Sequence, residues 1–241
     1  MTGTTAGAEH TMTARDTQVQ GIFNRITTSY DRVNSLMTLG RHAAWCREVA
    51  QRAGVGPGGR VLDIATGTGE IALALRRREP RAEVAGVDFS EKMLETARTK
   101  PGADAITWEF ADAHSLRFDD ESFDAVTHGY LLRNVSDVPR VLAEQVRVLR
   151  PGGRVVVLET APPRGALRLA ISAGMSVVLP LLGQVVAGDR RAYDYLKDST
   201  LGFIQPARVA ELMREAGFVD VGYESKYLGT NVILWGRKPG S

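Results

Sequence analysis

Short apolar, β-branched runs alternate with amphipathic stretches along the middle of the chain. The apolar runs are typical of buried strands and lie at 60–65, 83–89, 106–113, 123–130 and 154–160. The stretches between them repeat their apolar positions with helical spacing and lie at 70–78, 91–100 and 137–149. This alternation predicts βαβ units, and therefore an α/β fold with a parallel sheet.

The two ends of the chain add helices and a pair of strands. Residues 16–54 have helical periodicity, with Trp45 and Val49 on one face, and residues 206–218 predict a second helical region. The last two strand-like runs, 221–227 and 231–237, are separated by three residues, which is a connection of hairpin type. We therefore expect the sheet to end in an antiparallel hairpin.

Composition and charge narrow the function. The formal net charge is +2 with acidic and basic residues mixed along the chain, so no basic stripe indicates nucleic-acid binding. The single cysteine, Cys46, excludes an intramolecular disulfide and fits a reducing cytoplasm. Residues 1–15 are small and polar and lack an apolar core, which predicts a disordered tail rather than a signal peptide.

One long segment carries no charge. It runs for twenty residues from Leu169 to Gly188, about the length that a membrane span needs. Gly174, Pro180 and Gln184 interrupt it, and its hydrophobicity is modest for a span. A buried or pocket-lining pair of helices over an apolar ligand fits this segment better.

The stretch VLDIATGTGE, residues 61–70, places Gly67 and Gly69 in a turn after a strand. Two glycines in a turn are a weak signal alone. Asp88, however, ends the second strand nineteen residues after Gly69, where a carboxylate can accept hydrogen bonds from ribose hydroxyls. Asp112 ends the third strand, where it can meet an adenine edge. Together these residues predict a nucleoside-like ligand.

The turn distinguishes between two such ligands. It lacks the third glycine of the dinucleotide fingerprint, because Gly69 is followed by Glu70, Ile71 and Ala72. It also lacks a basic residue, which suits a ligand with a sulfonium and an amino acid better than a pyrophosphate. These features favour S-adenosylmethionine over a nicotinamide dinucleotide.

Four segments resemble class I S-adenosylmethionine-dependent methyltransferases. They are VLDIATGTGE, VDFSEKML, residues 111–135 and VLRPGGRVVVLE. Residues 22–49, Leu132-Arg133-Asn134-Val135 and the run from Ala192 to Leu196 are more specific. With them the chain, from about Val19 to Lys238, resembles the ubiquinone/menaquinone biosynthesis C-methyltransferase family.

The resemblance implies one Rossmann-like domain over 16–241 with a seven-stranded, mostly parallel sheet. Its expected parts are a helical cap at 16–54, a cofactor-binding half at 55–160, an apolar substrate lid at 161–205, and a last helix and hairpin at 206–241. The implied cofactor is S-adenosyl-L-methionine. The implied acceptor is a small apolar molecule such as the prenylated quinol demethylmenaquinol. A homodimer and a peripheral membrane contact of a cytoplasmic protein are compatible with this family.

The cofactor contacts that we expect lie in the cap and at the ends of the first four strands. They are Tyr30, Asp63, Ala65, Gly67, Thr68, Gly69, Asp88, Phe89, Met93, Asp112, Ala113 and Gly129.

Methyl transfer to a ring carbon needs an aligned, electron-rich acceptor, and loss of a hydroxyl proton activates it. His128 titrates in the right range and is expected just past the fourth strand, although a buried histidine with satisfied hydrogen bonds explains it as well. Arg133 stays protonated and could stabilise a phenolate or merely pair with an acid, and Asn134 could orient a water. Tyr193 and Tyr195 could touch acceptor oxygens or simply pack. No cluster has metal-ligand spacing, so we expect no metal.

Two segments depart from the family pattern and leave the acceptor open. Tyr130-Leu131 stands where the family usually has Phe-Gly, and residues 228–235 differ from its usual Thr-Gly-Gly-Ile-Val-Ala-Leu-His. The alternatives are C-, O- or N-methylation of a specialised metabolite, and a methyltransferase-fold protein that no longer transfers methyl. A nicotinamide oxidoreductase of this fold is the remaining rival.

Overall fold

Seven strands form one sheet in the computed structural model, which describes residues 13–165, 169, 172–174, 176–177 and 189–240. The strands are β1 Arg60–Ile64, β2 Glu83–Asp88, β3 Thr107–Phe110, β4 Phe123–Gly129, β5 Leu149–Thr160, β6 Val219–Lys226 and β7 Asn231–Arg237. Their order is β3-β2-β1-β4-β5-β7-β6. Strands β1 to β5 pair in parallel, and β7 is antiparallel to both β5 and β6. The predicted mostly parallel sheet with a C-terminal antiparallel hairpin is confirmed.

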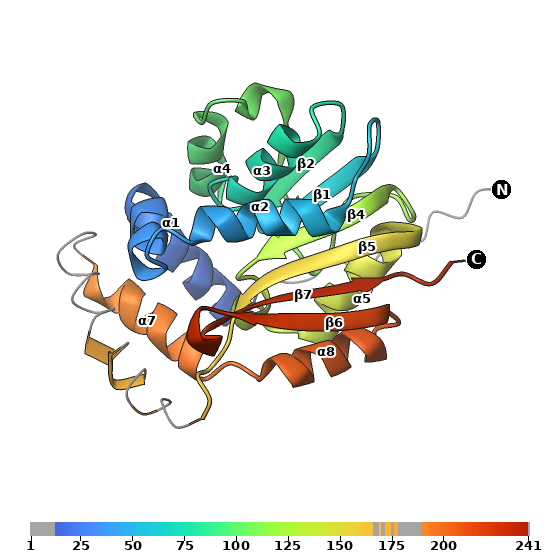
Figure 1. The fold of residues 1–241 in the computed structure, drawn as a ribbon. Helices are drawn as coiled ribbons and strands as arrows, with labels where there is room; N and C mark the ends of the chain where they lie inside the picture. Colours follow the sequence, from blue (N-terminus) through green and yellow to red (C-terminus); the bar gives the residue numbers. More distant parts are fainter. Residues whose placement is uncertain (1–12, 166–168, 170–171, 175, 178–188, 241) are drawn as a thin grey trace.

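Helices cover both faces of this sheet and its end. They are α1 Ala14–Met37, α2 His42–Ala53, α3 Glu70–Arg78, α4 Glu91–Arg98, α5 Val138–Val148, α7 Arg190–Leu201 and α8 Pro206–Glu215. Single helical turns lie at Ala103–Ala105, Leu132–Asn134 and Tyr227–Gly229. Figure 1 shows α2, α3 and α4 on one side of the sheet, α5 and α8 on the other, and α1 with α7 across one end.

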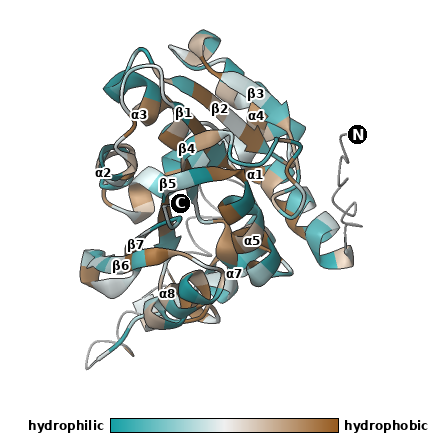
Figure 2. Cartoon of the chain, turned by 90° about the vertical axis from the view of Figure 1, so that its right-hand side faces the viewer, coloured by the Kyte–Doolittle hydropathy of each residue, from teal (hydrophilic) through white to brown (hydrophobic). Residues whose placement is uncertain are grey.

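The alternation of side chains along the strands builds two apolar layers. In β1, Leu62 and Ile64 pack in the layer that includes α5 and α8, whereas Val61 packs in the layer that includes α2 and α3. Central strands of a parallel sheet are buried on both faces, and Figure 2 shows hydrophobic stretches in β1 and β2. The sheet is therefore a rigid support for the loops at its ends.

Helix α1 begins two residues before the expected start of the helical cap. Thr13 and Asp16 form a capping box, in which the Thr13 hydroxyl accepts from the Asp16 amide and the Asp16 carboxylate accepts from the Thr13 amide. This reciprocal pair satisfies two amides that would otherwise lack partners at a helix start. The rest of the predicted tail, residues 1–12, lies outside the described residues.

Most of the uncharged segment from Leu169 to Gly188, and with it much of the predicted apolar lid, also lies outside the described residues. Helix α7, at the end of that region, is capped by Asp189, whose carboxylate accepts from the Ala192 amide at 3.0 Å. In the described part of the chain, no helix is long and apolar enough to cross a membrane.

Candidate functional site

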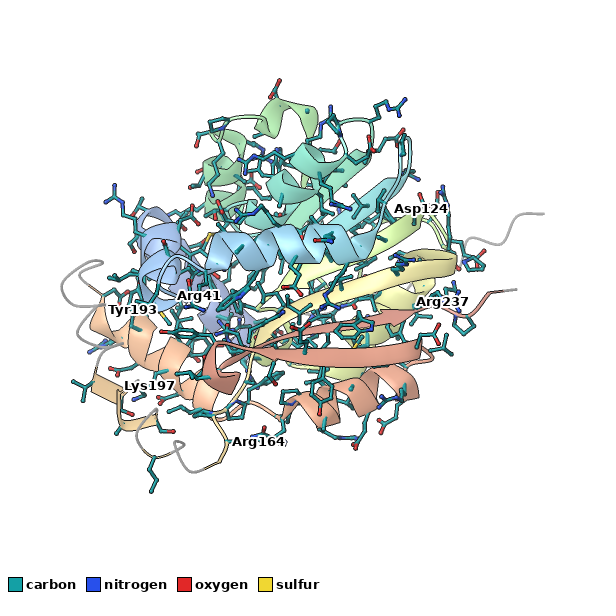
Figure 3. The ribbon with its side chains drawn as sticks, viewed as in Figure 1. Arg41, Asp124, Arg164, Tyr193, Lys197 and Arg237 are labelled. Carbon is teal, nitrogen blue, oxygen red and sulfur yellow. The ribbon has the colours of Figure 1, made fainter. Side chains whose placement is uncertain are left out.

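A pocket of about 720 Å³, partly open to solvent, lies where the parallel strands end. This is the end of the molecule at which Arg41 and Tyr193 lie in Figure 3, opposite Asp124 and Arg237. We call it the first pocket. Its lining comes from α1 and from the loops after β1, β2, β3 and β4, and consists of Asp16, Phe23, Tyr30, Ala65, Gly67, Asp88, Phe89, Met93, Ala111, Asp112, Ala113, His114, Gly129, Tyr130, Leu131, Asn134 and Val135.

Nine of the twelve residues expected to contact a cofactor line this pocket. The three that do not line it are Asp63, Thr68 and Gly69. Asp63 is buried beneath the turn and accepts hydrogen bonds from the hydroxyls of Thr66 and Thr127 at 2.6 and 2.8 Å. Burial raises the pKa of Asp63 to about 7, against the effect of those hydrogen bonds. It therefore supports the turn from below.

The glycine turn leaves room where a ligand can approach the backbone. Gly67 has φ +56°, and a Cβ added there would meet no protein atom within 4 Å. Its amide donates to the Asp88 carboxylate at 2.8 Å, and the other oxygen of Asp88 accepts from the Ser90 amide at 2.8 Å. Burial raises the pKa of Asp88 to about 6, so the carboxylate is ionised at neutral pH. A fixed anion thus lies beside an open stretch of backbone.

Gly69 is required for a different reason. It has φ +83°, and a Cβ there would lie 2.6 Å from a ring carbon of Trp108. Only glycine avoids both the backbone strain and this overlap. Trp108 therefore packs against the turn and fixes the start of α3.

Helix α1 is fastened over the first pocket by polar contacts at three points. The Gln20 amide donates to the Phe89 carbonyl, and the Ser90 hydroxyl donates to Asn24 Oδ1 at 2.5 Å. Asp31 accepts from the Thr68 hydroxyl at 2.5 Å and pairs with Lys100 at 2.6 Å. Thr68 therefore contacts α1, which covers the pocket, and does not line the pocket itself.

Asp16 and Phe23 also line the pocket, and the sequence analysis missed them. Together with Tyr30 they are spaced by seven residues, which places all three on one face of α1. That spacing was present in the sequence and could have indicated the face that covers the pocket.

A second pocket, of about 1100 Å³ with open solvent included, adjoins the first. It is lined by Asn34, Met37, Thr38, Tyr130, Arg133, Thr160, Gly174, Leu196, Thr200, Tyr227, Leu228, Thr230 and Asn231. Tyr130 lines both pockets and lies where they meet. Arg133 and Asn231 contact the Tyr130 side chain, whereas Met37, Leu196 and Leu228 supply an apolar part of the lining.

The buried ion pair of Arg133 and Glu159 lies beside this junction. Arg133 Nη1 donates to Glu159 Oε1 at 2.8 Å and to the Thr160 hydroxyl at 3.2 Å. The side chains are 6% and 0% exposed, and Arg133 Nε and Glu159 Oε2 have no partner among the described residues. Arg133 therefore pairs with an acid, which is one of the two roles expected for it. It also lines the second pocket.

Asn134 lies on the first-pocket side of the junction. Its Nδ2 donates to the Tyr130 carbonyl at 2.6 Å, and its Oδ1 accepts from the Tyr195 hydroxyl at 2.9 Å. Tyr193, the other tyrosine of α7, is fully buried against Ile22 and Ile26 of α1 and lines neither pocket. Tyr195 is therefore the α7 tyrosine that reaches the site.

The expectation that His128 follows the fourth strand is wrong. It lies inside β4, paired in register with Ile64 and Val157, and it lines neither pocket. Complete burial lowers its pKa to about 3, so the ring is neutral at physiological pH. In the part of the chain that is described, no group of three or more His, Cys, Asp or Glu is arranged to hold a metal ion.

Comparison with known proteins adds a family match. The model of the ubiE/COQ5 methyltransferase family matches residues 11–238. A Desulfotalea psychrophila protein named ubiquinone/menaquinone biosynthesis C-methyltransferase UbiE is 47% identical over 221 residues, covering 91% of this chain and 90% of that protein. A demethylmenaquinone methyltransferase from Deinococcus radiodurans is 43% identical over 203 residues, covering 83% of this chain and 84% of that protein.

The fold has solved counterparts as well. A structure described as an S-adenosylmethionine-dependent methyltransferase from Thermotoga maritima superimposes with a TM-score of 0.63 and 23% identity, covering 91% of this chain and 99% of that one. At this identity the likeness concerns the fold, which is the class I methyltransferase fold that the sequence predicts.

Proposed function

The chain belongs to the ubiE/COQ5 methyltransferase family, and on that premise we propose that it methylates a ring carbon of an apolar, prenylated quinol such as demethylmenaquinol. The observation that carries the proposal is the pair of adjoining pockets that meet at Tyr130. One has the carboxylate and the open glycine turn that suit a nucleoside. The other is wider and partly apolar.

The first pocket fits S-adenosyl-L-methionine. The open space beside Gly67 admits a ligand against the backbone, and the ionised Asp88 suits ribose hydroxyls and a positively charged ligand. Asp112 and Met93 line the part of the first pocket that suits the adenine ring, and Tyr30 of α1 covers the pocket. When bound, this cofactor supplies a sulfonium methyl group for transfer.

The second pocket suits the acceptor. Arg133 and Asn231 line it beside Tyr130, which also lines the first pocket, so an oxygenated ring there would be next to the methyl donor. Met37, Leu196 and Leu228 also line the second pocket and suit an apolar tail. This arrangement aligns the two reactants, which is the main contribution that such a site can make to rate.

Arg133 and Asn134 are the chain's own contributors to the chemistry. The guanidinium, oriented by Glu159, stabilises the negative charge that develops on a ring oxygen when its proton leaves. Asn134, fixed by Tyr130 and Tyr195, can hold a water that receives the ring proton. His128 and Tyr193 have no part in this proposal, because neither is among the described residues that line these two pockets.

We also propose a peripheral membrane contact through which the acceptor is collected. Leu39 and Leu228, about two-thirds exposed, and Leu36, half exposed, lie beside or among the residues that line the second pocket. Clustered exposed leucines at a pocket of this kind are typical of a surface that meets lipid. Flotation with liposomes tests this, and a protein that stays at the bottom of the gradient with and without acceptor contradicts it.

Methyl transfer from labelled S-adenosylmethionine to a panel of reduced quinones tests the main proposal. The panel comprises demethylmenaquinol, a short-chain analogue and an unprenylated naphthohydroquinone, with products identified by mass spectrometry. We expect transfer to the prenylated rings and a much lower kcat/KM for the unprenylated ring. Tight binding of S-adenosylhomocysteine with no transfer to any quinol would reject the acceptor class while keeping the cofactor site.

A further inference from the structure

Tyr130 has a backbone conformation that side-chain-bearing residues rarely adopt. Its φ is +57°, in the left-handed region, which is unfavourable for a bulky residue. Two hydrogen bonds hold it there: its amide donates to the Leu158 carbonyl at 2.7 Å, and its carbonyl accepts from Asn134 at 2.6 Å. Strain that is held in place in this way is found chiefly at functional sites.

Two side chains also pack against the Tyr130 ring. The Arg133 guanidinium lies 4.9 Å from the ring centroid, and the His42 ring is stacked with a centroid distance of 5.7 Å and an interplanar angle of 24°. With backbone and ring both fixed, the hydroxyl has one position. That position is beside Asn231, which lines the second pocket together with Tyr130.

A chain of hydrogen bonds fixes the direction in which this hydroxyl donates. Asn231 Oδ1 lies 3.3 Å from the Tyr130 oxygen and, as a carbonyl oxygen, can only accept, so the Tyr130 hydroxyl donates to it. His42 Nδ1 lies 3.4 Å from the same Tyr130 oxygen and therefore donates to it, which leaves Nε2 of the neutral ring as an acceptor, since burial lowers the pKa of His42. Cys46 Sγ lies 3.5 Å from Nε2 and can donate to it, because burial raises the pKa of the thiol and the thiol keeps its proton.

The hydrogen bond from the Tyr130 hydroxyl to Asn231 Oδ1 is long at 3.3 Å. O–H···O hydrogen bonds in proteins usually measure about 2.7–2.8 Å. A ligand oxygen at ordinary distance would therefore be a better acceptor for the same proton. Asn231 lies beside it on the wall of the second pocket with Thr230, whose hydroxyl accepts from Asn231 Nδ2 at 3.2 Å. Tyr130 and Asn231 come from the two segments in which the sequence departs from the family pattern.

We propose that the Tyr130 hydroxyl, supported by His42 and Asn231, is a specificity-determining contact that donates a hydrogen bond to one oxygen of the acceptor ring. Because the acceptor is taken to occupy the second pocket, this assignment rests on the proposed function. The assignment adds that the protein selects an acceptor whose ring carries two oxygens. One of them contacts the Tyr130 hydroxyl, and the other faces Arg133. Burial raises the pKa of Tyr130 well above its usual value, so the group remains a donor when the acceptor oxygen becomes negative.

Binding to three ring compounds tests the assignment. The probes are a short-chain prenylated 1,4-naphthohydroquinone and the two analogues that each lack one of its hydroxyls. Calorimetry with protein loaded with S-adenosylhomocysteine measures each affinity for the wild type, for Tyr130→Phe and for the control Tyr223→Phe. The control removes a phenol hydroxyl from an exposed side chain of β6 and leaves both pockets intact.

We expect Tyr130→Phe to weaken binding of the dihydroxy ring about fivefold, the effect of one hydrogen bond, and to leave one of the monohydroxy analogues unaffected. In methyl-transfer assays kcat/KM for the dihydroxy ring should fall by about 10-fold or more, as for a hydrogen bond to a charged oxygen. The control should behave as the wild type.

Equal weakening of all three probes would overturn the assignment, because it would mean that the substitution merely alters the pocket's shape. No weakening of any would overturn it too. If the wild type binds the dihydroxy ring but does not methylate it, the proposed function fails, while the pattern of affinities still decides the role of Tyr130. If the wild type binds none of the three, both fail.

Discussion

Replacing Arg133 by Met should unfold the protein more easily and abolish methyl transfer, for two separable reasons. The substitution leaves Glu159, which is completely buried, with neither its ionic partner nor the hydrogen bond at 2.8 Å. Removing one partner of a buried ion pair costs about 3–5 kcal/mol, because the other charge is left without compensation. For a chain of 241 residues each kcal/mol lowers Tm by about 2–4 °C, so a fall of about 6–20 °C is expected.

The double variant Arg133→Met/Glu159→Leu separates the two reasons. Replacing a whole buried pair by apolar residues of similar volume is often close to neutral, so most of the lost stability should return. Activity should not return, because the positive charge that faces the acceptor is still missing. Glu159→Leu alone isolates a buried guanidinium and should be as unstable as Arg133→Met.

Thermal unfolding of the four proteins, followed by methyl-transfer assays at a temperature where all are folded, measures both quantities. A double variant that regains stability and also transfers methyl at a rate close to that of the wild type would refute the role of Arg133. Its charge would then serve only to pair with Glu159. A double variant no more stable than either single variant would instead refute the account of the ion pair.

Other predictions concern the glycine turn, the buried Asp63 and His128 of β4. Gly67→Ala should weaken binding of S-adenosylhomocysteine at least tenfold in calorimetry, because its Cβ enters the open space of the first pocket, and should cost about 1–2 kcal/mol of stability through its positive φ. Gly69→Ala should lose more stability than Gly67→Ala, because the Cβ at position 69 would also overlap the Trp108 ring. The pKa of Asp63 is raised to about 7, so the folded state binds a proton at this carboxyl more tightly than the unfolded state does. The stability that this proton contributes is full below about pH 4 and is lost as pH rises through about 7. Asp63→Asn should therefore flatten the fall in Tm between these pH values. An unchanged slope would contradict that pKa. His128→Leu should keep kcat/KM within about twofold, since the ring is buried inside β4 and lines neither pocket; a loss of activity in a folded variant would restore His128 as a catalytic candidate.

The sheet could be predicted because each strand and helix has its own local signature. Buried strands of a parallel sheet are continuous apolar runs, and the amphipathic stretches between them have helical spacing. The place of β7 between β5 and β6 was not specified by the hairpin itself. The run of Val232, Ile233 and Leu234 did contain the signal, since a strand buried on both faces is a central one, whereas the polar alternation of β6 is typical of an edge.

The residues of the site were less predictable where a single position decides the outcome. A polar histidine near the end of an apolar run resembles a strand end, yet β4 continues through His128 to Gly129 because both neighbouring strands pair with it. Tyr193 and Tyr195, two residues apart on a helix, must face different ways, and only the packing of α7 on α1 decides which one reaches Asn134.

The junction at Tyr130 lay beyond sequence reasoning for a further reason. Its partners His42, Arg133 and Asn231 come from α2, the turn after β4 and the start of β7. No local pattern links these segments. Contacts across such separations follow only from the assembled sheet.

Methyl transfer to demethylmenaquinol with deuterium at the ring carbon tests the central claim most directly. The proposed C-methylation replaces that deuterium, so mass spectrometry should find a methylated product that has lost it, formed by the wild type and not by Arg133→Met. A product that is methylated and retains the deuterium would show transfer to oxygen. That result, or no product from a protein that binds both the ring and S-adenosylhomocysteine, would contradict the account.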